Sequence, residues 1–179
     1  MASFETFFRA LVKDISVELT DEFDRNFERK GFFNESWKAT KWANSKGSLM
    51  MRSGGLRRSV KNQVSDDSIS WTSSRPDAIL HNNGGEITVT AKMKRFFWAM
   101  YYKASGAAGK GKSKRAITLT QEAARWKSLA LMKVGSKMKI PKRQFIGSHP
   151  QVDKTIKEIT DEHVNKLEAS LYNALKNRK

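Results

Sequence analysis

The chain has 179 residues, and its 34 lysines and arginines against 18 acidic residues give a formal charge of +16 at pH 7. This surplus favours a polyanionic neighbour, such as nucleic acid, an anionic membrane or an acidic protein surface. The absence of cysteine excludes disulfides, thiolate catalysis and cysteine-based zinc or iron–sulfur sites.

The length and a hydrophobic content of 39% are enough for one folded domain with a buried core. Glu5, Arg9 and Lys13 interrupt the start of the chain, which argues against a signal peptide. The longest apolar run, Phe96–Tyr102, is too short to span a bilayer. We therefore expect a soluble intracellular protein.

A long amphipathic helix is predicted at the N-terminus. Ser3 can cap it, and Glu5 in its first turn suits the positive end of the helix dipole. Gly31 is the expected residue after its last turn. We interpret the apolar stripe as core or as a helix interface between subunits, because acidic residues on the polar face oppose binding to anionic lipid. The stripe consists of Phe4, Phe7, Phe8, Leu11, Val12, Ile15, Leu19, Phe23 and Phe27.

Short elements are predicted in the middle of the chain. After two glycines at 54 and 55, Leu56–Gln63 is expected to form a short helix. Alternating apolar and polar residues predict strands over 68–72 and 86–90. Asp77–His81 can form one or two helical turns. Asn82–Gly85 is expected to be a turn, because asparagine and glycine reach positive φ at low cost.

The second half of the chain is predicted to be mostly helical. Lys92–Lys103 has helical spacing and is expected to be buried on most sides, and a flexible basic loop is expected over 104–115. Thr120 can cap a further helix that ends at Gly135, and Lys137–Ile140 is a predicted strand. A C-terminal helix is predicted from an apolar seam of Val152, Ile156, Ile159, His163, Leu167, Leu171 and Leu175.

Together these elements predict one α+β domain over residues 1–179. The expected architecture is a long N-terminal helix, a small antiparallel or mixed sheet with helices packed on it, and a C-terminal helix. The chain shows no internal repeat.

Residues 106–113 match the phosphate-binding P-loop pattern Gly-x-x-x-x-Gly-Lys-Ser. A working P-loop needs a buried strand before it and a helix that starts at the Lys-Ser pair, here Lys112 and Ser113. The preceding segment, Arg95–Lys103, instead has helical spacing. We interpret the match as a chance product of a loop rich in glycine, lysine and serine.

No enzyme, cofactor or metal site is predicted. The three histidines, His81, His149 and His163, show no ligand spacing with one another or with carboxylates, and no serine sits on a nucleophile-elbow pattern. The best local candidate for a polyanion contact is the basic loop, although a solvated loop explains it equally well. Its basic residues are Lys110, Lys112, Lys114 and Arg115.

Three segments together resemble the tail-completion, or virion morphogenesis, family of tailed bacteriophages. They are Leu49–Ser59, Ala78–Gly85 and Ile140–Gly147. In this order they resemble a Leu-x-x-(Ser/Thr)-Gly-x-Leu-x-x-Ser block, an Ile-His-x-x-Gly-Gly corner and an Ile-Pro-x-Arg-x-Phe-(Leu/Ile)-Gly block. Trp37 stands where such proteins often carry a tryptophan, whereas Asp77 and Ala78 stand where a tyrosine is usual. The matching positions are Gly54, Leu56, Ser59, His81, Gly84, Gly85, Pro141, Arg143, Phe145 and Gly147.

The resemblance implies a non-enzymatic part of the virion, in the tail or neck, that is assembled in the host bacterial cytoplasm. Such proteins act as an oligomeric ring, often a hexamer, that completes the tail or joins it to the head. The implied partners are further copies of the chain, the tail tube, the neck or connector proteins and, without sequence specificity, packaged DNA; no membrane is implied. A ring around a DNA channel gains from a positive surface.

The resemblance also gives the matching residues structural roles. Gly84 and Gly85 would form a corner, Pro141 would stop a strand, Phe145 would anchor the core and Arg143 would act as a hydrogen-bond clamp. The alternative is a free-standing basic nucleic-acid-binding protein, which the charge favours but no helix-turn-helix, zinc or RNA-recognition signature supports.

Overall fold

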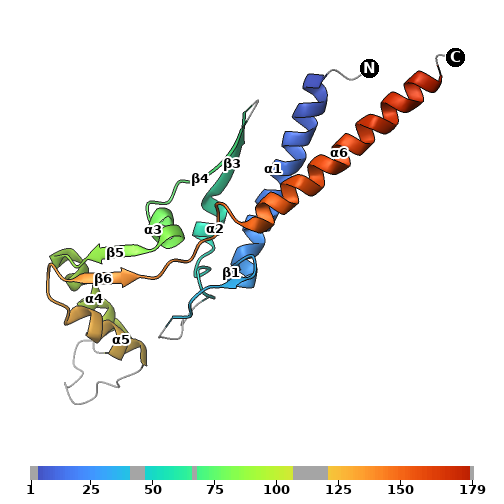
Figure 1. Ribbon diagram of the computed structural model, residues 1–179. Helices are drawn as coiled ribbons and strands as arrows, with labels where there is room; N and C mark the ends of the chain where they lie inside the picture. The colour runs from blue at the N-terminus through green and yellow to red at the C-terminus, as the bar shows by residue number, and fades with distance from the viewer. Residues whose placement is uncertain (1–3, 41–46, 66–67, 107–120, 178–179) are drawn as a thin grey trace.

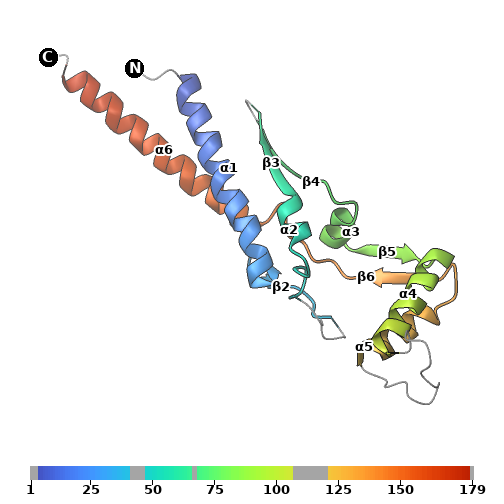
Figure 2. The same cartoon turned by 180° about the vertical axis from the view of Figure 1, so that it is seen from behind.

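The computed structural model describes residues 4–40, 47–65, 68–106 and 121–177 (Figure 1). Two long helices, α1 (Phe4–Arg29) and α6 (Pro150–Lys176), lie side by side in both views (Figures 1 and 2). We call this pair the helical arm. It extends from one end of an elongated molecule, and both termini lie at its tip. The predicted N-terminal and C-terminal helices are confirmed.

The elements between the two long helices are short, and their order confirms the predicted α+β class. The helices α4 and α5 pack against each other at the end of the molecule opposite the arm (Figure 1). The intervening elements are β1 (Gly31–Phe32), β2 (Glu35–Ser36), α2 (Gly55–Ser59), β3 (Val60–Val64), β4 (Ile69–Ser73), α3 (Ala78–Asn83), β5 (Gly85–Thr88), α4 (Ala91–Ala104), α5 (Gln121–Ala130) and β6 (Lys137–Ile140).

The named strands form three separate antiparallel pairs rather than one sheet: β1 with β2, β3 with β4, and β5 with β6. None of these strands exceeds five residues. The pair β5–β6 matters most for the site, because it joins segments about 50 residues apart, with Gly85 opposite Ile140 and Thr88 opposite Lys137. The chain between them contains α4 and α5.

The stripe of α1 supplies two hydrophobic clusters. The first contains Leu19, Phe23 and Phe32, and Trp71 of β4 meets Phe23 edge-on with ring centroids 5.1 Å apart. Partly buried residues from the first turns of α6 pack on the same cluster. The second cluster joins α1 to the segments Leu49–Ser59, Ala78–Gly85 and Ile140–Gly147, which we call the first, second and third motif segments. Its buried members are Phe27, Trp37, Leu56, Ala78 and Phe145.

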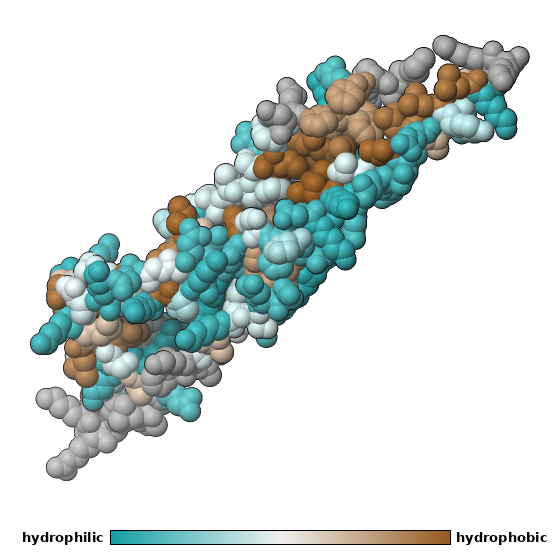
Figure 3. Space-filling model, viewed as in Figure 1, coloured by the Kyte–Doolittle hydropathy of each residue, from teal (hydrophilic) through white to brown (hydrophobic). Residues whose placement is uncertain are grey.

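The outer half of α6 carries an apolar surface. No residue of α6 is buried, and the seam that packs on α1 near Val152 continues to Leu171 and Leu175, whose exposed fractions are 45% and 66%. The space-filling view shows this apolar surface along the tip of the arm (Figure 3). His163 lies between the two helices, with Nε2 2.9 Å from Oδ2 of Asp14. No helix in the described ranges is both long and apolar enough to cross a membrane.

Two predicted elements were wrong in part. The helix expected over 56–63 ends at Ser59, and Val60 adopts extended dihedral angles and starts β3. All five residues of β3 pair with β4, so the sheet partner overrides the local helical preference. Asn82 and Asn83 of the expected turn are instead the last part of α3, and the chain turns at Gly84 and Gly85, with φ of 73° and 155°.

Three smaller predictions also need correction. The residue with positive φ after α1 is Lys30, at 57°, and Gly31 instead lies in β1, where a Cβ would come within 2.7 Å of the Glu35 carbonyl oxygen. The helix α5 ends at Ala130, before Gly135. On α4 only Phe97 and Tyr101 are buried, so this helix is not buried on most sides.

Candidate functional site

The second and third motif segments are held together by backbone hydrogen bonds. The amide N–H of Arg143 donates to the carbonyl of His81 at 2.8 Å. The side-chain oxygen of Asn82 accepts the amide N–H groups of Phe145 and Ile146 at 2.9 and 3.2 Å. Asn82 therefore acts as a clamp that the sequence analysis missed, because Asn-Asn-Gly-Gly had been interpreted only as a turn.

The same segment is held from the other side by α1 and by Trp37. The Trp37 indole N–H donates to the Gln144 carbonyl at 2.6 Å. Asn26, whose exposed fraction is 0%, donates to the Phe145 carbonyl at 3.2 Å and accepts the Phe33 amide N–H at 2.9 Å. An asparagine on the apolar face of a helix was the available signal for Asn26, and the sequence analysis did not use it.

The first motif segment forms a tight turn into α2. Gly54 has φ of 66°, and a Cβ there would come within 2.7 Å of Nη1 of Arg58. Leu56 is buried in the second cluster. The hydroxyl of Ser59 donates to the Leu56 carbonyl at 2.7 Å and lies 2.7 Å from the Ser73 hydroxyl of β4. These contacts fix α2 against β4.

The remaining motif positions surround the pair β5–β6. Gly84 ends α3, and a Cβ there would come within 2.8 Å of the Lys142 backbone nitrogen. Gly85 begins β5, and Pro141 directly follows β6. Gly147, with φ of 130°, precedes the start of α6. These positions therefore shape the backbone where α3, β6 and α6 meet.

A cavity of about 350 Å³ lies where the three motif segments converge. We call it the arginine cleft, because four arginines line it and only one acidic residue does. Its arginines come from the first segment, from the loop before α3, from α5 and from the third segment. The lining residues are Thr40, Leu49, Met50, Arg52, Ser53, Gly54, Gly55, Leu56, Arg75, Asp77, His81, Arg125 and Arg143.

The charge of Arg75 is matched inside the cleft by Asp77. Arg75 forms a two-pronged contact with Asp77, with both N–O distances 2.8 Å, and this contact lowers the pKa of the Asp77 carboxyl. Arg143 is buried, with an exposed fraction of 7%, and it donates from Nε and Nη2 to the Lys38 carbonyl at 3.2 and 3.1 Å. Burial lowers the pKa of Arg143.

Two further basic groups of the cleft, Arg125 and His81, have lowered pKa values. Burial, followed by the nearby charge of Arg52, lowers the pKa of Arg125. Burial is also the main reason that the pKa of His81 is lowered. Nδ1 of His81 is buried and has no hydrogen-bond partner among the described residues. The cleft therefore concentrates positive charge around a buried histidine nitrogen that has no hydrogen-bond partner among the described residues.

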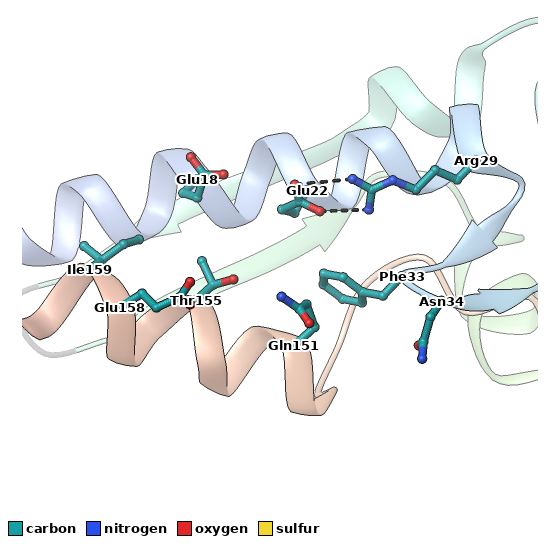
Figure 4. Close-up of a pocket in the computed structure, with 9 residues that line it drawn as sticks. All are labelled: Glu18, Glu22, Arg29, Phe33, Asn34, Gln151, Thr155, Glu158 and Ile159. Atoms are coloured by element: carbon teal, nitrogen blue, oxygen red, sulfur yellow. Dashed lines mark hydrogen bonds and ion pairs between the residues drawn. The ribbon is translucent and has the colours of Figure 1, made fainter.

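A second groove, of about 600 Å³, lies between α1 and α6 and carries the opposite charge (Figure 4). We call it the acidic groove, since Glu18, Glu22 and Glu158 line it with Arg29 as the basic residue. Burial raises the pKa of Glu22, but hydrogen bonds from Arg29 and Arg25 outweigh it, and the net shift is downward. Glu18 and Glu158 keep side-chain exposed fractions of 47% and 62%.

Several sequence-based candidates cannot be placed. The basic loop residues Lys110, Lys112, Lys114 and Arg115 lie outside the described residues, as does the P-loop-like motif except for its first glycine. Among the described residues, no group of three or more histidines and carboxylates could hold a metal ion.

Comparisons with known proteins agree with the motif segments. The model of the phage virion morphogenesis family matches residues 2–165 of the chain. That range includes α1, all three motif segments and the first half of α6. Neither a curated protein nor a solved structure matches the chain.

Proposed function

The chain belongs to the phage virion morphogenesis family, and on that premise we propose that it is a non-enzymatic structural protein that completes the phage tail or joins the tail to the head. The observation that carries the proposal is the family match over residues 2–165. The contacts of the motif residues support a structural role, because Asn82, Arg143 and Phe145 hold backbone segments together or fill the core.

We propose further that the protein acts as a homo-oligomeric ring, often six-membered in this family, around the DNA channel of the virion. Uneven charge along the chain supports this arrangement. Helix α1 contains seven acidic and four basic residues, whereas residues 30–152 contain 24 basic and six acidic residues. Identical subunits can therefore meet through opposite charges and still present basic surface to packaged DNA. Its other partners would be the tail tube and the neck or connector proteins.

The alternative is a free-standing nucleic-acid-binding protein, which the excess of 24 basic over six acidic residues in 30–152 favours. Such a protein would bind duplex DNA tightly as a monomer, with an affinity that falls steeply as salt rises. A structural subunit would bind DNA weakly until a ring had formed. Native mass and DNA affinity, measured on one nuclease-treated preparation at low and high salt, separate the two functions.

The direct test of the structural function is to infect cells with a phage that carries a stop codon early in this gene and to examine the particles it produces. We expect filled heads and separate tails, or tails of uncontrolled length, in electron micrographs of the lysate. Purified protein added to that lysate should restore infectious particles, and antibody should label the tail or neck. Normal, infectious virions without the protein would refute the structural function.

A further inference from the structure

The arginine cleft contains one buried guanidinium, that of Arg143, without a matching negative charge among the described residues. Arg143 forms no ion pair in the described part of the chain, and its side chain donates only to a backbone carbonyl. The one carboxylate among the described residues that line the cleft is Asp77, and Arg75 already pairs with it. Buried charges in folded proteins are normally paired, so the cleft lacks an anion.

The shape of the cleft restricts what that anion can be. Guanidinium groups have a fork of N–H donors that matches a carboxylate or a phosphate. However, Arg143 lines a cavity of about 350 Å³ and is only 7% exposed. A carboxylate at the end of a flexible side chain reaches a buried guanidinium more easily than a phosphate of duplex DNA, whose backbone is stiff.

We propose that the arginine cleft binds a carboxylate of a second copy of this chain, supplied by the acidic groove of the helical arm. The acidic groove offers Glu18 and Glu158, whose own ion pairs are long, at 4.0 and 3.6 Å, and exposed. Exposed pairs of this kind contribute little, so these carboxylates can exchange partners at low cost.

The molecule already uses this type of contact within one chain. Arg57 on α2 donates from Nε to the Asp24 carboxylate at 2.5 Å and from Nη2 to the Glu28 carboxylate at 2.8 Å, and both acids lie on α1. The arginine cleft and the acidic groove occupy different parts of each subunit. A contact between them is therefore head to tail, which is the type of contact that closes identical subunits into a ring.

This inference rests on the proposed oligomeric function and names the surfaces that make it. The first test compares Arg125→Gln with Lys127→Gln, which removes the same charge from the exposed side of the same helix. Native mass is measured by light scattering over a concentration series at low and high salt. We expect Arg125→Gln to raise the dissociation constant of the oligomer about tenfold or more, and Lys127→Gln to change it less than threefold.

The second test changes the opposite surface and does not depend on the stability of the cleft. The double variant Glu18→Gln/Glu158→Gln should weaken the oligomer like Arg125→Gln, whereas Asp161→Asn/Glu168→Gln, which removes two exposed charges elsewhere on α6, should not. When Arg125→Gln is combined with Glu18→Gln/Glu158→Gln, the dissociation constant of the oligomer should rise no more than in the weaker-binding of the two variants alone, because both remove the same contact. Independent, additive effects would overturn the pairing.

Three further outcomes would overturn the proposal. One is a wild-type chain that stays monomeric at all concentrations. Another is an equal rise in the dissociation constant of the oligomer in Arg125→Gln and in its control, Lys127→Gln. The third is a loss of DNA affinity in Arg125→Gln with unchanged native mass, which would assign the cleft to phosphate. A monomeric protein that still restores infectious particles in the stop-codon lysate would refute this inference and leave the structural function intact.

Discussion

Asn26 provides the sharpest test of how the motif segments are held. Its side chain is completely buried on α1 and bridges two backbone groups, the Phe145 carbonyl and the Phe33 amide. In Asn26→Ala both groups lose their hydrogen-bond partner. The third motif segment should then be held to α1 by apolar contacts alone.

The expected magnitude follows from the two hydrogen bonds. Each is worth about 0.5–1.5 kcal/mol net, and a buried polar group left without a partner adds further cost. We therefore expect Asn26→Ala to lower the free energy of unfolding by about 3 kcal/mol. For a chain of 179 residues this corresponds to a melting temperature lower by about 6–12 °C.

Urea unfolding followed by circular dichroism gives the free energy directly. The control is Asn165→Ala on the exposed face of α6, which includes the same gain in helix propensity and removes no described side-chain contact. A difference below about 1 kcal/mol between the two variants would refute the reasoning, since it would mean that Asn26 does not secure the segment.

A second substitution, Asn26→Asp, tests the same contact through pH. A buried carboxyl group has a raised pKa, so the variant should be least destabilised below the unfolded pKa of about 3.9, where the acid can donate to the Phe145 carbonyl. The difference in unfolding free energy between the variant and the wild type, measured at the same pH, should grow as the pH rises through the folded pKa. A deficit independent of pH would show that the carbonyl contact contributes nothing.

Three other predictions concern local geometry and charge. Gly84→Ala should lower the unfolding free energy by about 1–3 kcal/mol, measured by urea titration, and by more than Gly135→Ala, which meets open space at a similar positive φ. Arg57→Ala should cost about 0.5–1 kcal/mol at low salt and nearly nothing in 1 M salt. Arg75→Gln should raise the pKa of Asp77, which NMR can follow. Because Arg75 lowers that pKa in the folded protein, the ion pair adds stability above the unfolded pKa of about 3.9. This stability should be lost as the pH falls through the folded pKa.

The long helices were predictable because their signal is local and repeated. The stripe of α1 and the seam of α6 follow the 3.6-residue period over seven turns each, and the structure places them as expected. The strand over Lys137–Ile140 was also predicted at its observed bounds. That residues 1–179 form a single domain stays a prediction.

Elements that depend on a distant partner were less predictable. Val60 begins a strand whose five residues all pair with β4, and the side chain of Asn82, at the end of α3, accepts two amide N–H groups from the third motif segment. Neither partner is visible in a local window of sequence. The three segments could therefore be recognised from the sequence, whereas the hydrogen bonds that Asn26 and Asn82 make to the third of them could not.

The sequence by itself determined the class of fold, the family and the excess of positive charge, since periodicity, motif order and composition are properties of the chain alone. The tertiary structure decided where that charge is concentrated. Arg52, Arg75, Arg125 and Arg143 come from four separate segments, and only the pairing of β5 with β6 and the packing of α5 bring them to one cavity. Long-range pairing depends on cooperative burial, which no local pattern encodes.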